Sequence, residues 1–295
     1  MKGKKEMNKY KWTITGILLS LLFICAGCFP EQQMASPTPP PVAEGDLIVT
    51  FFDVGQGDAT LFQTEEATIL IDAGRHDREE VVSLLEGRGV ERIDLFIATH
   101  PHADHIGQAD QVLDAFPVEE VWMSGDSHTT KTFERMVEAL EASGADYYEP
   151  RAGEEFEVGP LLLEVLHPEE LTGDLNNGSI AVKLHFGEVS FLMMGDAEAE
   201  AEEEIIARSA HLQSTILRLG HHGSSTSTTP AFLEAVNPEA GIYSAGRDNE
   251  YGHPHSEVVE LFKEKAIPLF GTDQHGQIIV ETDGTSYEII LEHGE

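Results

Sequence analysis

The chain has 295 residues, which is long enough for one large α/β domain or two small ones. Its residues are 41% hydrophobic and 24% charged, a composition that excludes a disordered protein. The formal net charge of −35 repels nucleic acid, anionic lipid and wall polymers at long range, so a polyanionic substrate would need metal ions or a local basic spot. The only cysteines are Cys25 and Cys28, so the domain beyond them forms no disulfide and offers no thiolate ligand.

Residues 1–28 have the pattern of a lipoprotein signal peptide. Five lysines precede the apolar run Trp12–Ile24, which is too short for a comfortable membrane span. The following "CAGC" resembles a lipobox with Cys28 as the lipid acceptor, although Cys25 stands where leucine is usual. We expect Cys28 to become a lipidated N-terminus that anchors the protein to the membrane outside the cytoplasm. The alternative, an uncleaved N-terminal anchor, predicts the same side of the membrane.

Residues 29–45 are rich in proline and polar residues and predict an extended linker, so the folded domain should occupy residues 46–295. Within it, strands are predicted at 47–54, 67–74, 92–99, 119–124, 161–167, 179–187, 189–196, 214–220, 240–246, 268–273, 277–284 and 286–291. Helices are predicted at 78–87, 107–116, 132–143, 198–208, 230–236 and 255–265.

Strands outnumber helices by about two to one, which is too many for a simple doubly wound parallel sheet. Two segments, 181–194 and 277–290, have the pattern of hairpins closed by glycine-containing turns. We therefore expect partly antiparallel sheets that face each other, with helices outside.

A stretch beginning at His100, "HPHADH", places three histidines and an aspartate directly after the apolar run 92–99. Open α/β folds commonly have their sites at the carboxyl ends of strands. Alternate residues of an extended chain point the same way, so His100 and His102 should project together. Asp104 and His105 should begin the following helix, where a carboxylate meets the positive end of the helix dipole. This arrangement suits two metal ions about 3.5–4 Å apart.

Polar residues recur where other apolar runs end. Asp72 ends "ILIDAG" and Asp196 ends "SFLMMGD", while His221 and His222 end "TILRLGHH". We expect the Asp196 carboxylate to bridge two cations and Asp58, in "DVGQGD", to line the site. Taken singly, an aspartate in such a turn is as often structural, and the neighbouring glycines also serve tight backbone turns.

These motifs resemble the metallo-β-lactamase fold superfamily, whose HxHxDH signature "HPHADH" matches. Further motifs occur in the order found in the C-terminal domain of ComEC-type competence proteins: "FFDVGQGDAT", "LIDAG", "THPHADHIG", "NNGSIAVKL", "FLMMGDAEAEAE", "LGHHGSSTS", "NEYGHPHSEV" and "GTDQHGQIIVETDG". The resemblance implies a four-layer αβ/βα sandwich with a dinuclear site at one edge. It also implies a ligand set: His100, His102, Asp104, His105, the bridging Asp196, and one of His221 and His222.

We favour His221 as the ligand and His222 as a substrate-contacting or proton-handling residue. Many superfamily members supply another histidine between the signature and the bridging aspartate; His128, His167 and His185 are available here, none of them in a motif-like context. In the matching segment the chain has "NNGS", so Asn177 or Ser179 should face the metals or the substrate.

The leading hypothesis is an extracytoplasmic, lipid-anchored hydrolase with two divalent ions, Zn²⁺ or Mn²⁺, that cleaves DNA or a smaller phosphodiester. Asp104 would orient the nucleophile, His222 or His253 would protonate the leaving group, and Arg247 would bind a substrate phosphate. The lack of a Lys/Arg cluster in the sequence argues against DNA. The alternatives are a lactonase or β-lactamase, and a non-catalytic surface lipoprotein that uses the fold for binding.

Overall fold

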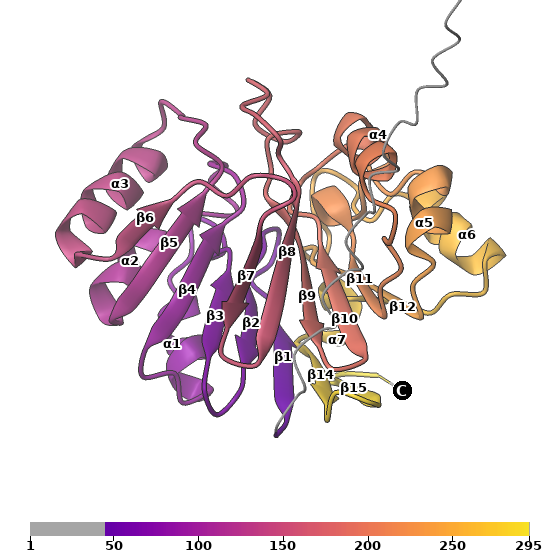
Figure 1. Cartoon of the computed structure of the whole chain (residues 1–295), viewed down its shortest axis with the longest axis horizontal. Helices are drawn as coiled ribbons and strands as arrows, with labels where there is room; N and C mark the ends of the chain where they lie inside the picture. Colours follow the sequence, from indigo (N-terminus) through magenta and orange to yellow (C-terminus); the bar gives the residue numbers. More distant parts are fainter. Residues whose placement is uncertain (1–44, 295) are drawn as a thin grey trace, which may run out of the picture. The chain divides into compact units, whose positions relative to one another are not determined.

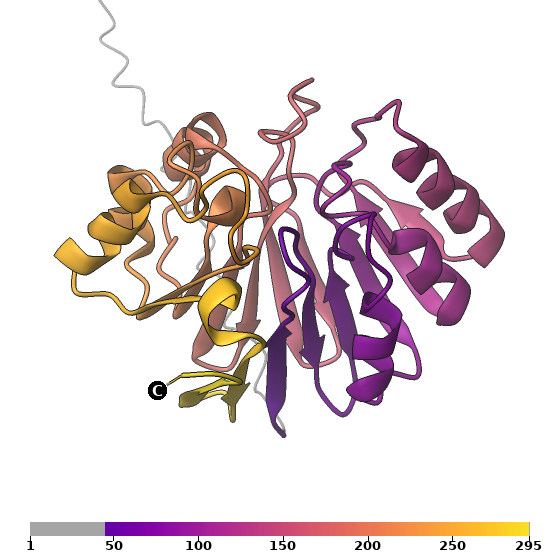
Figure 2. The ribbon, with the colours of Figure 1, turned by 180° about the vertical axis from the view of Figure 1, so that it is seen from behind.

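The computed structural model of the protein describes residues 45–294. The predicted signal peptide and nearly all of the predicted linker lie outside these residues and remain predictions. The described residues form two sheets packed face to face, with one group of helices outside each sheet (Figure 1; Figure 2). This is the four-layer sandwich expected from the sequence.

The eight-stranded sheet has the order β15-β14-β1-β2-β3-β4-β5-β6, with strands β1 (Leu47–Phe51), β2 (Thr60–Gln63), β3 (Thr68–Ile71), β4 (Ile93–Ala98), β5 (Val118–Met123), β6 (Asp146–Tyr148), β14 (Ile278–Thr282) and β15 (Tyr287–Leu291). The seven-stranded sheet has the order β13-β12-β11-β10-β9-β8-β7, with strands β7 (Glu155–Val158), β8 (Leu161–His167), β9 (Ala181–Phe186), β10 (Val189–Met193), β11 (Ile216–Arg218), β12 (Ala240–Tyr243) and β13 (Leu269–Gly271).

The helices are α1 (Val81–Gly87), α2 (Ala109–Ala115), α3 (Lys131–Ser143), α4 (Ala199–Arg208), α5 (Pro230–Val236), α6 (Ser256–Glu264) and α7 (Thr272–His275), with a 3₁₀ turn at Gly220–Gly223. Helices α1 to α3 lie outside the eight-stranded sheet, and α4 to α6 lie outside the other (Figure 1). None of the helices within residues 45–294 combines the length and the apolar character needed to cross a bilayer.

Both predicted hairpins are confirmed, because β9 pairs with β10 and β14 with β15 in antiparallel register. Three strands were not predicted from the sequence: β2, β6 and β7. Strand β6 and strand β7 are edge strands with exposed or half-buried residues, so neither has the buried apolar run that marks a strand in the sequence. Helix α1 begins at Val81 and α2 at Ala109, each later than predicted.

Three apolar layers hold the sandwich together, one between the sheets and one under each group of helices. Strand β4 shows how one sequence supplies two layers. Leu95 and Ile97 face the other sheet, whereas Phe96 packs beneath the helices. A central strand is therefore buried on both faces and appears in the sequence as a continuous apolar run. Trp122, 1% exposed, belongs to the layer between the sheets.

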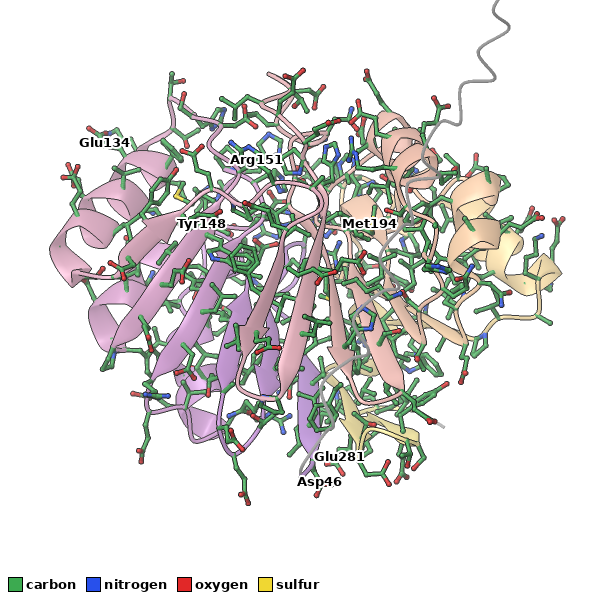
Figure 3. All side chains as sticks on the ribbon, in the orientation of Figure 1. Asp46, Glu134, Tyr148, Arg151, Met194 and Glu281 are labelled. Carbon is green, nitrogen blue, oxygen red and sulfur yellow. The ribbon has the colours of Figure 1, made fainter. Side chains whose placement is uncertain are left out.

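The acidic surplus lies on the surface of the described unit. Figure 3 shows Asp46, Glu134 on α3 and Glu281 on β14 projecting at its periphery, and all three are exposed. Charges of one sign spread over the outside favour solubility and leave the buried layers apolar. Buried polar residues inside such a chain therefore require specific partners.

Candidate metal centre

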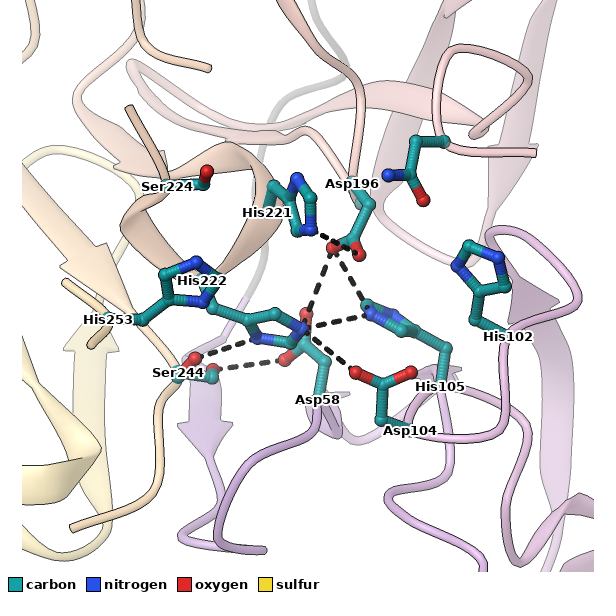
Figure 4. A network of polar contacts seen from close by, with 12 residues as sticks. Asp58, His102, Asp104, His105, Asp196, His221, His222, Ser224, Ser244 and His253 are labelled. Atoms are coloured by element: carbon teal, nitrogen blue, oxygen red, sulfur yellow. Dashed lines mark hydrogen bonds and ion pairs between the residues drawn. The ribbon is translucent and has the colours of Figure 1, made fainter. Parts of the chain in front are cut away.

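The carboxyl ends of parallel strands from both sheets meet at one edge of the sandwich, and a polar residue follows each of them. Asp72 follows β3, which is parallel to β4, and His100 comes shortly after β4. In the other sheet, Asp196 follows β10, His221 follows β11 and Ser244 follows β12. Because parallel strands end at the same edge, these residues converge although they are distant in the chain. Figure 4 shows the site seen from close by.

Four imidazoles surround the carboxylate of Asp196, which is 2% exposed. Their Nε2 atoms lie near its oxygens, at 3.5 Å for His100, 3.1 Å for His105, 3.8 Å for His221 and 3.7 Å for His222. In Figure 4 the side chains of His105, His221 and His222 point toward Asp196 from three directions. The structure thus brings the "HPHADH" segment and the "GHHG" segment together around the carboxylate of Asp196.

The remaining ring nitrogens of His105 and His222 are held by groups that only accept hydrogen bonds. His105 Nδ1 lies 2.7 Å from Asp72 Oδ2, and His222 Nδ1 lies 2.8 Å from the carbonyl oxygen of Ser244. A carboxylate or a carbonyl requires the proton on Nδ1, so the Nε2 lone pair of a neutral ring faces the centre of the site. This is the arrangement in which proteins orient histidines that bind metals.

His100 and His221 are oriented in the same way. Thr99 Oγ1 donates to Asp72 Oδ2 at 2.8 Å, which leaves its oxygen to accept from His100 Nδ1 at 3.2 Å. His221 Nδ1 lies 3.0 Å from the carboxylate of Glu198. All four rings therefore direct Nε2 toward Asp196, although the groups that orient them come from separate elements.

This donor set fits a cation better than it fits a network of hydrogen bonds. Among the described residues, the buried Asp196 Oδ1 has no hydrogen-bond donor other than a protonated His105 Nε2, which lies 3.1 Å away. His105 Nε2 and His222 Nε2 face each other at 3.2 Å. Three groups of donor atoms among the described residues are compact enough to hold an ion: His100, His105 and Asp196; Asp104, His105 and His222; and Asp58, Asp72 and His105.

The charges in the site favour a cation at its centre. Burial disfavours the charged form of His105, but the carboxylates of Asp196 and Asp72 outweigh burial and raise its pKa well above the ordinary value. Burial opposes ionisation of Asp196, but His105, His222 and His100 together outweigh burial and lower the pKa of Asp196 well below its ordinary value. Burial, followed by repulsion from His105, lowers the pKa of His100. A bound cation would take the place of the His105 proton.

Asp104, His102 and His128 line a pocket of about 360 Å³ that opens onto Asp196. His102 Nδ1 lies 3.0 Å from His100 Nε2, so the two rings project together as predicted. Asp104 and His105 do not begin α2; they lie in a turn before it, since the helix starts at Ala109. Asp104 Oδ2 lies 3.3 Å from His222 Nε2. The sequence offered a signal for His128, because it follows β5 as His100 follows β4.

The structure assigns structural partners to three residues predicted to contact substrate. Asp58 is 1% exposed and forms an ion pair with the buried Arg218, beneath the pocket instead of in it. Ser179 is fully buried, and its Oγ accepts from the backbone N–H of Asp196 at 3.1 Å. Asn177 Oδ1 accepts from the N–H of Glu198 at 3.1 Å and thereby caps α4. These side chains hold the site together and do not face its pocket.

His253 and Arg247 lie beside the site rather than in its donor groups. His253 lines the pocket, and burial followed by repulsion from His222 lowers its pKa to about 4. At neutral pH only a small fraction of His253 carries the proton that the predicted general-acid role requires. Arg247 is exposed and lines an adjoining pocket with Arg75 and Arg78. The sequence shows no Lys/Arg cluster, but the fold brings these three arginines together beside Asp53, Asp248 and Glu250.

Two histidines of the site have backbone conformations that cost free energy. His221 has φ 48° and His222 has φ 56°, both in the left-handed region that non-glycine residues rarely adopt. The preceding Gly220 allows close packing, because a Cβ atom there would lie 2.6 Å from the carbonyl oxygen of Ala197. Such conformations persist where the surroundings impose them, and they cluster at functional sites.

The fold and the donor set define a metal-dependent hydrolase of one superfamily. The sequence profile described as "Metallo-beta-lactamase superfamily" matches residues 52–247, more than half of the chain. The chain therefore belongs to the metallo-β-lactamase superfamily. The likeness to solved structures agrees at the level of the fold. CmlA, a diiron β-hydroxylase from Streptomyces venezuelae, is 16% identical with a TM-score of 0.56 over 84% of this chain and 55% of that one. The metallo-β-lactamase fold protein YhfI from Bacillus subtilis is 14% identical with a TM-score of 0.54 over 81% of this chain and 100% of that one.

Curated relatives are similar over a longer stretch. ComE operon protein 3 from Bacillus subtilis (strain 168) is 29% identical over 256 residues, which cover 80% of this chain and 33% of that protein. Competence protein ComA from Neisseria gonorrhoeae is 29% identical over 247 residues, which cover 81% of this chain and 33% of that protein. The chain thus spans about a third of the length of these relatives, and it is homologous to one part of each.

Proposed function

We propose that the protein is a hydrolase of phosphodiesters that uses two divalent cations, Zn²⁺ or Mn²⁺. The observation that carries the proposal is the orientation of four imidazole Nε2 atoms toward Asp196, each fixed by an acceptor or hydroxyl at its Nδ1. Nitrogen and oxygen donors without thiolate suit Zn²⁺ and Mn²⁺. When bound, two such ions supply Lewis-acid activation of a water nucleophile and neutralise developing charge on phosphoryl oxygens.

The two ions would share the carboxylate of Asp196. His100 and His102 would hold one ion, and Asp104, His105 and His222 the other. The compact group of Asp104, His105 and His222 supports the second of these sites, and His105 also belongs to the compact group of His100 and Asp196. It revises the preference drawn from the sequence, since His222 belongs to that group and His221 does not. His221, 24% exposed and paired with Glu198, would complete the first site or contact substrate.

Phosphodiesters are favoured over carbonyl substrates for two reasons. The curated relatives are named for competence and, in Haemophilus influenzae, for recombination, and both names point toward nucleic acid. In addition, the pocket beside the site contains three arginines, which recognise phosphate oxygens well. A smaller phosphodiester, such as a phosphocholine ester, is a second substrate of the same chemical class.

The test is a substrate panel with the purified protein, stripped of metal and then supplied with Zn²⁺ or Mn²⁺. Bis-p-nitrophenyl phosphate, single-stranded DNA, a phosphocholine ester, a lactone and a cephalosporin are compared. We expect turnover of the phosphodiesters only, abolished by a chelator and by Asp196→Ala. Glu134→Gln, on the exposed face of α3, is the matched control and should keep full activity. Chelator-resistant turnover, or preferred hydrolysis of the lactone or cephalosporin, would count against the proposal.

We further propose that the protein is attached to the outer side of the cytoplasmic membrane through a lipid on Cys28. The support is the basic, apolar and "CAGC" pattern of residues 1–28. Labelling of growing cells with radioactive palmitate should mark the wild-type protein and leave Cys28→Ser unmarked. Equal labelling of both proteins, or protection of both from protease added to spheroplasts, would contradict this location.

A further inference from the structure

A second pocket, of about 420 Å³, adjoins the metal centre and contains Arg75, Arg78 and Arg247. Gln56 and Tyr251 line both pockets, so the two are adjacent. A volume of this size accommodates a ligand as large as a nucleotide. The pocket therefore extends the candidate metal centre and is not a separate feature of the surface.

The arginines stand out against the charge of the chain. The whole sequence has 18 basic and 53 acidic residues, whereas three arginines and three acidic residues, Asp53, Asp248 and Glu250, line this pocket. One of those acidic residues has a structural partner, because Asp53 Oδ1 accepts from the backbone N–H of Gly55 at 3.0 Å. The lining of this pocket thus has no net charge and adds nothing to the repulsion that the remaining surface exerts on an anion.

Two of the arginines retain hydrogen-bonding capacity for a ligand. Arg247 forms no ion pair with any residue between 45 and 294; its Nε donates to the carbonyl oxygen of Asp273 at 3.2 Å. Arg78 has one long ion pair, 3.5 Å to Glu80, and 48% of its side chain is exposed. Arg75 differs, since it pairs with Asp77 through two contacts.

The absence of a side chain at Gly55 lets the guanidinium of Arg78 lie close to the backbone there. Gly55 has φ +70°, and a Cβ atom there would lie 2.8 Å from Nη2 of Arg78. The guanidinium therefore rests on bare backbone at the wall of the pocket. A guanidinium held against a backbone loses less conformational entropy on binding than a freely rotating one.

Tyr251 lies between the two pockets and exposes an aromatic face. Its side chain is 67% exposed, although it is one of the larger hydrophobic residues. Its ring stacks on His253 with centroids 5.7 Å apart and an interplanar angle of 24°. A ring supported on one face and open on the other is a stacking platform for a nucleobase.

We propose that the arginine pocket binds the phosphate that neighbours the scissile phosphate of a nucleic-acid strand, while Tyr251 stacks on the intervening base. The inference rests on the proposed phosphodiesterase function and specifies its substrate: a single strand with at least two linked phosphates. It also resolves the conflict between the net charge and a polyanionic substrate, because phosphates are neutralised only along the path from the metal centre to Arg78 and Arg247.

The test compares a substrate that has a neighbouring phosphate with one that lacks it. The double variant Arg78→Gln/Arg247→Gln should lower kcat/KM for a single-stranded oligodeoxynucleotide by about 10–100-fold, because two charge-assisted hydrogen bonds are lost. Its kcat/KM for bis-p-nitrophenyl phosphate should fall by a much smaller factor, because that ester has no neighbouring phosphate. Arg92→Gln, beside the amino end of β4 at the opposite edge of the sheet, is the matched control and should change neither.

A second comparison tests the base. Tyr251→Ala should lower kcat/KM for the oligodeoxynucleotide by about 5–100-fold and leave an abasic oligonucleotide unaffected, while Tyr251→Phe behaves as the wild type. If the wild-type protein hydrolyses bis-p-nitrophenyl phosphate but the arginine variant loses no oligonucleotide activity, the inference is wrong and the proposed function stands. Preferred cleavage of poly(glycerol phosphate), with dependence on the arginines but not on Tyr251, would overturn the assignment to nucleic acid. Absence of any phosphodiesterase activity in the wild type would overturn both.

Discussion

Arg218 is the buried residue through which the two halves of the site are joined, and its replacement should have a large and calculable effect. It is fully buried and forms an ion pair with Asp58, which lies on the loop between β1 and β2. Its Nη1 donates to the carbonyl oxygens of Gly195 at 2.8 Å and Leu219 at 2.6 Å. These carbonyls precede Asp196 and the His221–His222 pair, so one side chain ties three segments together.

The cost of Arg218→Met can be worked out from these contacts. Breaking a buried ion pair by removing one partner costs about 3–5 kcal/mol, because the other charge stays buried. The carbonyl of Leu219 loses its donor, which adds about 1–3 kcal/mol. The carbonyl of Gly195 keeps the N–H of His221 at 3.0 Å and adds little. The sum, about 4–8 kcal/mol, approaches the whole stability of many domains.

Urea unfolding followed by circular dichroism measures this loss. Adding Asp58→Asn to Arg218→Met should recover about 2 kcal/mol or more, because the buried carboxylate is then neutral while Ser244 keeps its acceptor. Arg92→Met, which removes a 62% exposed arginine from its pair with Asp94, should cost no more than about 1 kcal/mol. The reasoning fails if Arg218→Met costs as little as Arg92→Met, or if the second substitution lowers stability further.

Three other predictions concern the metal centre, the cap of α4 and the protonation of His167. Zn²⁺ at about 100 times its Kd should stabilise the wild type by about 2.7 kcal/mol per site, measured as a rise in Tm that a chelator reverses. Asp196→Ala should abolish this rise in Tm. An unchanged rise in the variant would exclude Asp196 from the metal site. Asn177→Ala should lower stability by about 0.5–2 kcal/mol through loss of the α4 cap without changing KM, whereas a raised KM at unchanged stability would restore its predicted role in substrate binding. Burial lowers the pKa of His167 below its ordinary value of 6.5 in the folded protein. The unfolded chain therefore binds more protons than the folded protein below pH 6.5. The contribution of neutral His167 to the free energy of unfolding is complete above pH 6.5 and is lost as the pH falls toward the folded pKa, with a slope of up to about 1.4 kcal/mol per pH unit. In urea unfolding of the metal-free protein between pH 7 and 5, His167→Gln should show a shallower loss than the wild type, and parallel curves would contradict the assignment.

Periodicity, turn residues and the types of polar residue at strand ends were sufficient to predict the architecture and the kinds of side chain that gather at the site. Continuous apolar runs such as that of β4 arise because a central strand is buried on both faces, and the two glycine-containing hairpins follow from turn geometry alone. The "HPHADH" stretch indicated metal ligands because spacing and residue type are local properties of the chain. The edge strands β6 and β7 escaped because pairing at a sheet edge needs no buried apolar run.

Only the tertiary structure decided which way each side chain faces and what it contacts. Asp58 has the same side chain as Asp104, but an ion pair with Arg218 holds Asp58 beneath the site. No local sequence pattern predicts a partner so distant in the chain. His222 faces the other donors because the carbonyl of Ser244 holds its Nδ1. Arg78 and Arg247 form one pocket because β12 ends beside the loop that follows β1. Each of these outcomes depends on contacts between distant segments, which form only once the parallel strands of both sheets end at a common edge.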